Sequence, residues 1–481
     1  MNVLVVMSDQ HNPKMLGCAG HQWARTPNLD ALAAEGTRFT AAYTNSPICV
    51  PARAAWATGR YVHETRCWDN AIAYEGEPPG WGHALQAAGV RVDSIGKLHY
   101  RDSHAPTGFD HQLNPMHLAG GIGQVWGSVR DPLPRRQNAH LLVSWSGAGE
   151  SDYTRYDDRS TELACEWLAE RGRDPHSPLV LYVGLVAPHH PWIAPQAFFD
   201  LYDPSSLPPA SMRPSDGYER HPWVEAYAQM LVGLDSRNTD EERRRCTAAY
   251  YGLVSFMDHN VGRILGALDD AGLRDDTLVV YTTDHGDMVG KRGLWGKSVL
   301  YEESAGIPLI VAGPGVPRAT TSGTPVTLVD GYPTILQAAG VPPLPDERPR
   351  PGRSWTDTAS AADDPGRIAF AEYHAMGASS AAFLVRRGRF KLNYYLGFPP
   401  ELFDLEADPE ETTNLAPDPN LASVLSELQA ALFAIADPEE VDRQAKIDQA
   451  ALVERFGGPE RAAELGTVAE TPVPTNPTKA I

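Results

Sequence analysis

Cysteine is scarce in this sequence, and its scarcity narrows the class of protein. The 481 residues include only five cysteines, and none pairs with another at the spacing typical of a metal site. A small, odd number also argues against a scaffold held together by disulfides. We therefore expect the protein to reside in a reducing compartment. The five are Cys18, Cys49, Cys67, Cys165 and Cys246.

Long apolar runs are missing as well. No segment approaches the roughly 20 consecutive apolar residues of a membrane-spanning helix. The apolar run 3–7 follows Met1 directly, is too short for the core of a signal peptide and has no basic residues before it. These features predict a cytoplasmic protein that does not associate with membranes.

The sequence also lacks an excess of basic residues. The chain has 41 Lys and Arg residues against 61 Asp and Glu residues, which gives a formal net charge of −20. Binding to nucleic acid needs clustered basic side chains that displace counterions, so nucleic acid is not an expected partner. A local basic cluster can still bind a small anionic substrate, because it reverses the mean field locally.

What is present is an alternation of strand-like and helical segments. Apolar runs at 3–7, 90–95, 179–186 and 278–282 have the length and composition of buried strands. Helices are predicted from Thr26-Pro27-Asn28 to Gly36 and from Thr239-Asp240 to Gly272. This alternation is typical of an α/β fold, in which a large, mainly parallel or mixed sheet lies between helices.

The C-terminal part has a different composition. The proline-rich stretch 341–351 resembles a linker, and short strands at 368–373, 382–385 and 390–395 precede a helix at 421–435. A chain of this length usually exceeds one compact core. We predict a catalytic α/β domain (1–345), a smaller C-terminal α+β subdomain (346–436) and a tail (437–481) that packs on a neighbouring subunit.

Polar residues follow all four predicted buried strands. In open α/β sheets, ligands bind at the carboxyl ends of the strands, so these residues are expected to share one site. Two aspartates and a histidine among them suit a divalent cation, although each aspartate alone is more often a helix cap. The four groups are Asp9-Gln10-His11, Lys97-Leu98-His99, His189-His190 and Asp284-His285.

The segment Cys49-Val50-Pro51-Ala52-Arg53 places a cysteine in a C-x-P-x-R frame at an expected helix start. Alone, this frame fits equally well a plain helix start, with Pro51 in the first turn and Arg53 on the surface. Taken with the polar groups above, it resembles the signature of the type I sulfatases. Most of the chain is similar to this sulfatase branch of the alkaline-phosphatase superfamily. Further matching segments are Thr26-Pro27-Asn28-Leu29-Asp30, Leu402-Phe403-Asp404-Leu405 and Asp408-Pro409-Glu410.

The resemblance implies a site and a mechanism. A maturation enzyme would oxidise Cys49 to formylglycine, whose hydrate is the nucleophile that attacks sulfur. One divalent metal, calcium or manganese, would be bound by residue 49 together with Asp9, Gln10, Asp284 and His285. The remaining implied roles are a hydrate-stabilising Arg53, clamping Lys97 and Lys297, an acid His189, a base His99 and a substrate-binding Asn70.

The substrate stays open at this level. The pairs Asp9-Gln10 and Asp284-His285 resemble those of bacterial choline sulfatases and phosphonate monoester hydrolases. Three alternatives follow: a sulfatase of a small organic or aryl sulfate, a phosphonate monoester or phosphodiester hydrolase using the same residues, and a binding protein with a decayed site. A choline pocket would need an aromatic cage or a carboxylate, for which the candidates are Trp68, Trp126, Trp192 and Glu372. A homo-oligomer, dimer or tetramer, is expected.

Overall fold

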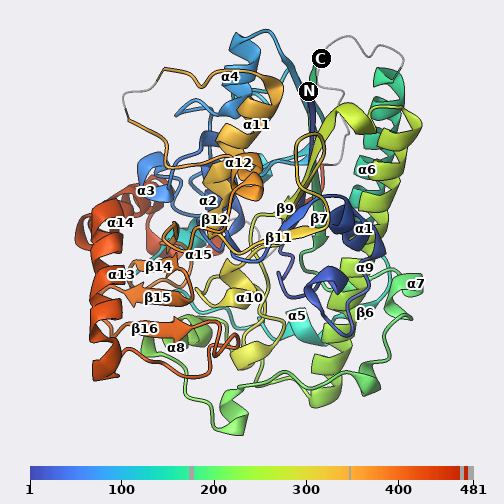
Figure 1. The fold of residues 1–481 in the computed structure, drawn as a ribbon. Coiled ribbons are helices and arrows are strands. Elements are labelled where there is room, and N and C mark those ends of the chain that lie inside the picture. Colours follow the sequence, from blue (N-terminus) through green and yellow to red (C-terminus); the bar gives the residue numbers. More distant parts are fainter. Residues whose placement is uncertain (173–177, 346–347, 466–470, 475–481) are drawn as a thin grey trace.

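A mixed eight-stranded sheet forms the centre of the protein (Figure 1). The computed structural model describes residues 1–172, 178–345, 348–465 and 471–474. Strands β9, β1, β7, β4 and β5 run parallel, β10 and β2 continue the sheet by antiparallel pairing, and β11 pairs parallel to β2. In spatial order the strands are β11 (Thr320–Ser322), β2 (Thr37–Phe39), β10 (Leu309–Ala312), β9 (Thr277–Thr283), β1 (Asn2–Asp9), β7 (Leu179–Pro188), β4 (Arg91–Lys97) and β5 (His111–Met116).

The four strands predicted from apolar runs are β1, β4, β7 and β9, which lie next to one another in the sheet. Three of them, β1, β7 and β9, are buried along their whole length, because helices cover both faces, and continuous apolar runs are typical of such strands. The shorter β2, β5, β10 and β11 were not predicted. Strands β2, β5 and β11 carry too few apolar residues in a row to be distinguished from loops, whereas the short apolar run of β10 could have been recognised.

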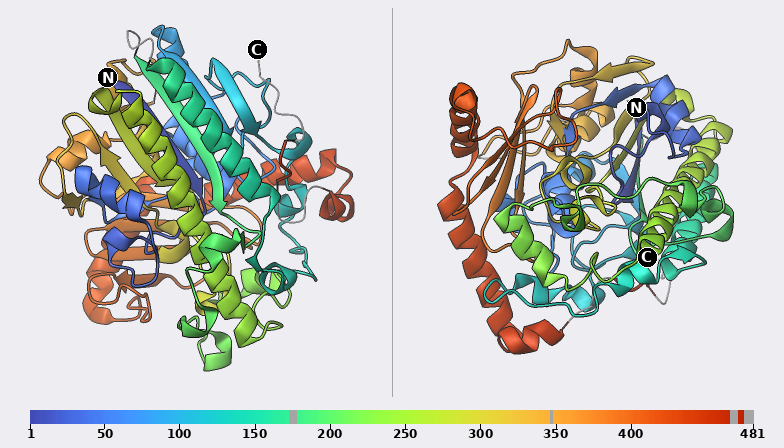
Figure 2. Two further views of the ribbon diagram at one scale, coloured as in Figure 1. Left: turned by 90° about the vertical axis from the view of Figure 1, so that its right-hand side faces the viewer. Right: turned by 90° about the horizontal axis from the view of Figure 1, so that it is seen from below.

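Helices cover both faces of the sheet, as the α/β prediction required. Alternate residues of β1 point to opposite sides: Leu4 and Val6 pack in one core, and Val3 and Val5 pack in the other. The first core includes α1 (Pro27–Glu35), α6 (Asp152–Arg171) and α9 (Asp240–Asp270), and the long helices α6 and α9 lie side by side in Figure 2. The second includes α2 (Cys49–Thr58), α4 (Trp81–Ala87), α11 (Gly331–Ala339) and α12 (Trp355–Ser360).

A small antiparallel sheet follows, in the order β13 (Ile368–Tyr373), β14 (Ala382–Arg387), β15 (Phe390–Tyr395) and β16 (Glu401–Asp404). One face of this sheet packs against α13 (Ala422–Ile435), and the other face packs against α8 (Pro222–Met230) and loops of the large domain. Three strands and the helix were predicted, whereas the four-residue β16 was not. Both faces are therefore covered, which couples the subdomain to the rest of the molecule.

The tail beyond α13 contains α14 (Pro438–Arg455) and α15 (Pro459–Glu464). On α14, Gln449 Nε2 donates to Asp69 Oδ2 and to the His374 carbonyl, each at 2.8 Å, so the helix packs on its own chain. Its predicted contact with a neighbouring subunit stays a prediction. No single described helix is long and apolar enough to cross a membrane, and only residues 419–435 and 438–455 taken together, with a bend of 47°, reach the required length and composition.

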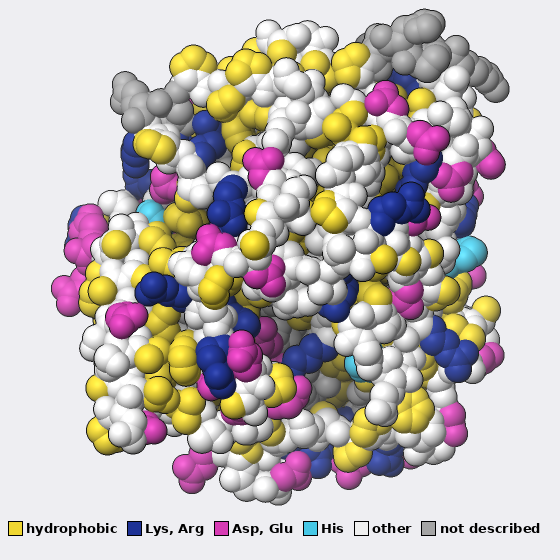
Figure 3. Space-filling model, in the orientation of Figure 1, with side chains coloured by type: hydrophobic (Ala, Val, Ile, Leu, Met, Phe, Trp, Pro, Cys, Tyr) yellow, Lys and Arg dark blue, Asp and Glu magenta, His cyan; other side chains and the backbone are white. Residues whose placement is uncertain are grey.

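The linker predicted at 341–351 is irregular where it is described, and residues 346–347 lie outside the described part. On the face shown in Figure 3, basic and acidic side chains are interspersed rather than gathered into one basic patch. The remaining short elements are α3 (Val62–Thr65), α5 (Leu141–Ser144), α7 (Gln196–Phe199), α10 (Glu302–Ala305), β3 (Ala42–Tyr43), β6 (Gly147–Ala148), β8 (Ile193–Ala194) and β12 (Val326–Thr327).

Candidate active site

Cys49 is the first residue of α2 and is buried at the carboxyl edge of the large sheet. Its Sγ lies 2.9 Å from Lys297 Nζ, 3.2 Å from His285 Nε2 and 3.7 Å from Asp9 Oδ1. A helix N-terminus exposes unpaired backbone N–H groups and the positive end of the helix dipole. An anionic oxygen bound at residue 49 would therefore be stabilised by the helix itself.

Arg53 lies one turn further along α2 and joins the strand ends. Its Nε donates to Asp284 Oδ2 at 2.8 Å, and its Nη2 donates to Asp9 Oδ2 at 3.1 Å. Its Nη1 donates to the Lys97 carbonyl at 3.0 Å and to the Tyr182 hydroxyl at 2.9 Å. With only 1% of its surface exposed, Arg53 is not a surface residue, so that alternative reading of the C-x-P-x-R segment is wrong.

The donor set fits a divalent cation. One ligand atom from each of Asp9, Cys49, Asp284 and His285 lies within 4.8 Å of the others. Arg53 engages the Oδ2 atoms of both aspartates, while both Oδ1 atoms lie 3.7 Å from His285 Nε2. His285 Nδ1 is 3.0 Å from the Gly286 carbonyl and donates to it, which leaves Nε2 unprotonated for a metal.

Gln10 completes this donor set. Its Nε2 donates to Asp287 Oδ2 at 2.6 Å, whereas its buried Oε1 has no hydrogen-bond partner among the described residues. Gln10 has a positive φ of 70°, which is uncommon for a residue other than glycine and is typical of functional sites. A buried amide oxygen without a partner is costly, so its position beside two carboxylates fits a metal ligand.

The cations of the site determine the charge of Asp9. Burial by itself raises the pKa of Asp9, but the positive charges of Lys97, Lys297 and Arg53 outweigh burial and hold this pKa well below its usual value. Lys97 Nζ is 2.8 Å from Asp9 Oδ2. Asp9 is therefore ionised at neutral pH, as a metal ligand must be.

The pKa values of Cys49 and Asp284 are shifted in the opposite direction, upward. Burial, with Asp9 nearby, raises the pKa of the Cys49 thiol to about 11 despite the lysines Lys297 and Lys97. Burial also raises the pKa of Asp284, and Asp9 adds to this rise against the effect of Arg53. An unmodified thiol with this pKa is protonated at neutral pH and is a weak nucleophile.

Two histidines border the same cavity. His189 Nδ1 lies 2.5 Å from the His190 carbonyl and donates to it, and its Nε2 faces Asp9 Oδ1 at 4.0 Å. Burial, then His190 and Lys297, lower the pKa of His189 well below its usual value. His99 Nε2 is 2.9 Å from Thr471 Oγ1, and burial followed by Lys97 lowers its pKa as well. Both imidazoles are thus neutral in this state.

Asn70 lies at the start of α2. Its Oδ1 accepts from the Val50 backbone N–H at 3.1 Å, and its Nδ2 donates to Gln124 Oε1 at 3.4 Å. It therefore satisfies one of the free N–H groups of the helix that carries Cys49. This capping contact was not part of the sequence prediction, which assigned Asn70 to substrate binding.

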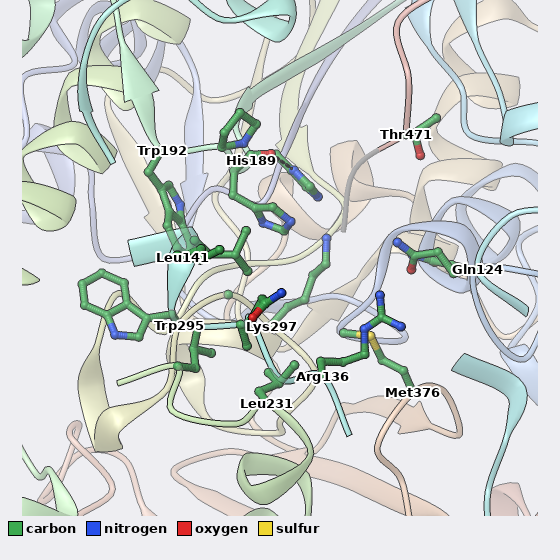
Figure 4. Close-up of a pocket in the computed structure, with 18 of the residues that line it drawn as sticks. Gln124, Arg136, Leu141, His189, Trp192, Leu231, Trp295, Lys297, Met376 and Thr471 are labelled. Carbon is green, nitrogen blue, oxygen red and sulfur yellow. Dashed lines mark hydrogen bonds between the residues drawn. The ribbon is translucent and has the colours of Figure 1, made fainter. Parts of the chain in front are cut away.

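A cavity of about 740 Å³ opens over these residues. Cys49, Asn70, Lys97, His99, His189 and Lys297 all line it. In Figure 4, Trp192, Leu141 and Trp295 lie on one side of the cavity, and Gln124, Arg136 and Met376 lie on the other. The structure thus brings all eleven predicted site residues together, four of them as the metal-ligand cluster and Gln10 and Arg53 in direct contact with it.

Sequence reasoning missed four supporting residues. Asp287 stands two residues after His285 and could have been recognised from the sequence. Tyr182, Asp157 and Thr471 carry no local signal. Asp157 accepts from the Val186 and Ala187 backbone N–H groups at 2.7 Å each, just before His189. These residues lie far from their partners in sequence, so only the fold brings them into contact.

The sheet order, the flanking helices and a cluster of strand-end carboxylates beside a helix N-terminus define an α/β protein with a candidate metal centre at the carboxyl edge of its large sheet. Comparison with known proteins identifies the family. The sequence model of the sulfatase family matches residues 1–341, and that of the C-terminal region of N-sulphoglucosamine sulphohydrolase matches residues 290–437. The chain belongs to the sulfatase family.

Curated relatives agree. Choline-sulfatase of Rhizobium meliloti (strain 1021) is 34% identical over 436 residues, which cover 87% of this chain and 83% of that protein. Arylsulfatase K of Danio rerio is 30% identical over 465 residues, covering 92% and 85%. Both matches extend over most of each chain, so the similarity includes the C-terminal subdomain.

Solved structures show the same fold. The phosphonate monoester hydrolase of Agrobacterium radiobacter superposes with a TM-score of 0.71 at 22% identity, covering 90% of this chain and 95% of that one. The phosphonate monoester hydrolase from Silicibacter pomeroyi gives 0.72 at 25% identity, covering 90% and 94%. The predicted fold class and family are therefore confirmed.

Proposed function

We propose that this protein hydrolyses sulfate monoesters of an organic or aryl alcohol, with formylglycine derived from Cys49 as the nucleophile. One observation carries the proposal: Cys49 begins a buried helix 2.9 Å from Lys297 and beside the two carboxylates that Arg53 holds. A thiol there is protonated and a weak nucleophile, whereas an aldehyde hydrate offers two hydroxyl groups on one carbon at the same point. The overall change is ester plus water to alcohol plus hydrogen sulfate.

A divalent cation would be held by Asp9, Gln10, Asp284 and His285, and it would supply Lewis acidity that lowers the pKa of a hydroxyl group at residue 49. Calcium and manganese both suit these oxygen and imidazole donors. We propose that a host maturation enzyme makes the formylglycine. The surrounding side chains would keep Asp9 ionised, keep His285 Nε2 unprotonated and orient both toward the cation.

The cationic side chains would hold the sulfate. Lys97 and Lys297 line the cavity and point at the position of the non-bridging oxygens, where fixed positive charge stabilises the transition state. Arg53 is engaged on all sides by carboxylates, a carbonyl and a hydroxyl, so we assign it to positioning the metal ligands. This differs from the role that the resemblance implied, in which Arg53 acts on the hydrate itself.

The histidines would move protons. We assign His189, whose Nε2 faces the site, to protonating the leaving alcohol oxygen, and His99 to taking the proton that accompanies sulfate release. Neither is charged in this state, so His189 must acquire a proton when the anionic substrate binds. Asn70, with its amide at the cavity wall and the helix start, would position the transferred group.

A second function is favoured by two of the fold neighbours, which are phosphonate monoester hydrolases. Sulfate monoesters and phosphodiesters carry the same single charge, so the same side chains accept either. The decisive experiment compares kcat/KM for an aryl sulfate, choline sulfate, an aryl phosphonate monoester and a phosphodiester on one metal-replete sample. Formylglycine content is verified first by mass spectrometry. A lead for the phosphorus substrates would replace the sulfatase assignment.

Variants at position 49 test the nucleophile. We expect Cys49→Ala to lower kcat by at least about 10³-fold, because the reacting oxygen is lost, while near-UV circular dichroism stays unchanged. Cys49→Ser should retain covalent sulfate detectable by mass spectrometry, because a serine ester has no second hydroxyl to expel it. Near-wild-type turnover by the alanine variant would overturn the assignment.

A further inference from the structure

The walls of the cavity above Cys49 are apolar on one side. Beyond the catalytic groups, the lining includes several leucine and tryptophan side chains, and Trp145, which also lines the cavity, is 72% exposed. Six of these large apolar lining residues are Leu141, Leu142, Trp145, Trp192, Leu231 and Trp295. With about 740 Å³, the cavity has room for a drug-sized molecule and far exceeds what a small alcohol such as choline would fill.

No acidic residue stands among the described residues that line the cavity, but arginine does. Of the aromatic and acidic candidates for a choline cage, Trp68 and Glu372 do not line it. Trp68 Nε1 donates to Asp448 at 2.7 Å, and Glu372 is bound between His63 and His374. Trp126 does line the cavity, but the Arg136 guanidinium covers its ring at 4.5 Å from the centroid.

Arg136 is held in place through its backbone. Its N–H donates to the Met230 carbonyl at 2.8 Å, and its own carbonyl accepts from the Val232 N–H at 3.2 Å. Within the described residues its side chain has an aromatic neighbour but forms no ion pair, and its partial burial lowers its pKa. A partly desolvated guanidinium without a carboxylate costs free energy that an anionic ligand would offset.

These observations extend the proposed function and rest on it. We propose that the leaving group is a bulky apolar alcohol or phenol that carries a second anionic group, and that Arg136 binds this group while the tryptophan and leucine wall contacts the apolar body. A quaternary ammonium group finds neither a carboxylate nor a free aromatic face on the Arg136 side of the cavity. Trp192, the remaining candidate, lines the opposite wall, where no acidic residue stands beside it among the described lining residues, so we expect choline sulfate to be a poor substrate.

The test uses a matched pair of biphenyl sulfate esters. One carries a para carboxylate on the ring distal to the ester, and the other carries the neutral carboxamide there, so that leaving-group reactivity is nearly equal. We expect the formylglycine-verified, metal-replete enzyme to prefer the carboxylate ester at least tenfold in kcat/KM, and choline sulfate to be poorer than both. Arg136→Met should remove the preference while leaving the carboxamide ester nearly unaffected.

Arg155→Met is the matched control, because it removes one positive charge from the exposed surface of α6, away from the cavity. This variant should keep the wild-type preference for the carboxylate ester over the carboxamide ester. Equal rates for the two esters in the wild type, an equal loss for both in Arg136→Met, or choline sulfate as the best substrate would each overturn the inference.

A binding measurement separates this inference from the proposed reaction. Calorimetry with the two product phenols needs no turnover and can use the unmodified Cys49 protein. If sulfate esters are not hydrolysed but the carboxylate phenol still binds at least tenfold more tightly than the carboxamide, and Arg136→Met abolishes this difference, the reaction assignment fails and the anionic subsite stands. Equal binding of the two phenols refutes the subsite.

Discussion

At the residue scale, the orientation of one amide group decides whether the metal donor set is complete. Asp287 Oδ2 accepts from Gln10 Nε2 at 2.6 Å, which leaves Oε1 as the amide atom without a hydrogen-bond partner among the described residues. Asp287 Oδ1 in turn accepts from the Val289 and Gly296 backbone N–H groups at 2.8 and 3.0 Å. Asp287 thus holds both a candidate ligand and the loop that carries Lys297.

We expect Asp287→Asn to lower metal affinity by about 10- to 100-fold, as loss of an outer-sphere partner typically does. The new amide donor opposes Gln10 Nε2, so the glutamine amide must turn and present N–H₂ to the metal. In the double variant Asp287→Asn/Gln10→Glu, a carboxylate accepts from Asn and still offers an oxygen, and affinity should recover. Titration calorimetry with Mn²⁺ measures both. Unchanged affinity in the single variant would contradict the role of Gln10.

His11 makes stability depend on pH. It is buried between the Tyr281 hydroxyl and the Met15 carbonyl, and burial lowers its pKa to about 4, partly opposed by the Met15 bond. Between about 6.5 and 4 the unfolded chain takes up a proton here and the folded chain does not, so stability falls as pH falls through this window.

The expected loss is about 2 kcal/mol between pH 7.5 and pH 5, from 1.36 kcal/mol per pKa unit. His11→Gln should show a shallower decline in urea unfolding at fixed metal concentration, whereas the exposed His104→Gln should follow the wild type. Parallel pH profiles for His11→Gln and the wild type would show that His11 is not the cause.

At the element scale, helices are stabilised by side chains from distant segments. Thr26 precedes α1 but makes no side-chain capping bond. Instead, Asp258 of α9 accepts from the Leu29 N–H at 2.8 Å, from the Asn28 N–H at 3.2 Å and from Asn28 Nδ2 at 2.8 Å. The Thr-Pro-Asn segment therefore marks the helix start correctly, but the cap is tertiary.

Asp258→Ala should lower the free energy of unfolding by about 1–3 kcal/mol, because one buried donor and two partly buried donors lose their acceptor. The control is Asp270→Ala, an exposed acidic residue near the end of the same helix, for which we expect a change within about 0.5 kcal/mol. Urea denaturation followed by circular dichroism measures both. Equal, small effects would mean that water replaces the carboxylate at no cost.

At the scale of the whole molecule, the chain's two ends meet around the site. β1 delivers Asp9 and Gln10, while Thr471 near the other end contacts His99, and its carbonyl accepts from the Tyr153 hydroxyl at 2.8 Å. Val473 packs beside Met116 and Val186. The C-terminal segment thus forms part of the cavity wall, which its Thr-Pro-Val-Pro composition did not indicate.

Ending the chain after Leu465 retains α14 and α15 but removes Thr471. We expect kcat/KM to fall by up to about tenfold, because His99 loses its hydroxyl partner, with little change in melting temperature. Thr471→Ser, which keeps the hydroxyl, should behave like the wild type. Full activity of the shortened chain would show that the contact is dispensable. Sedimentation velocity of the wild type and the shortened chain tests the predicted role of the tail in oligomerisation.

Much of this protein is determined locally by its sequence. Continuous apolar runs specified β1, β7 and β9, the mixed segment 90–95 specified β4, and the rule that ligands meet the carboxyl ends of strands placed their polar residues at one site. Cys49 and Arg53 were identified through the resemblance of the C-x-P-x-R segment, taken with those polar residues, to the type I sulfatase signature. These features depend on residues near one another in the chain, where periodicity and motif carry the information.

Only the tertiary structure decided the rest. Asp287 orients the amide of Gln10, Thr471 contacts His99, and Arg136 covers the ring of Trp126. The partners in these pairs lie 277, 372 and 10 residues apart in the sequence. Each contact depends on side-chain direction and burial after folding. Even the contact between Trp126 and Arg136 depends on a loop that is held by backbone bonds to Met230 and Val232, so the shape of this cavity wall is a property of the packed molecule.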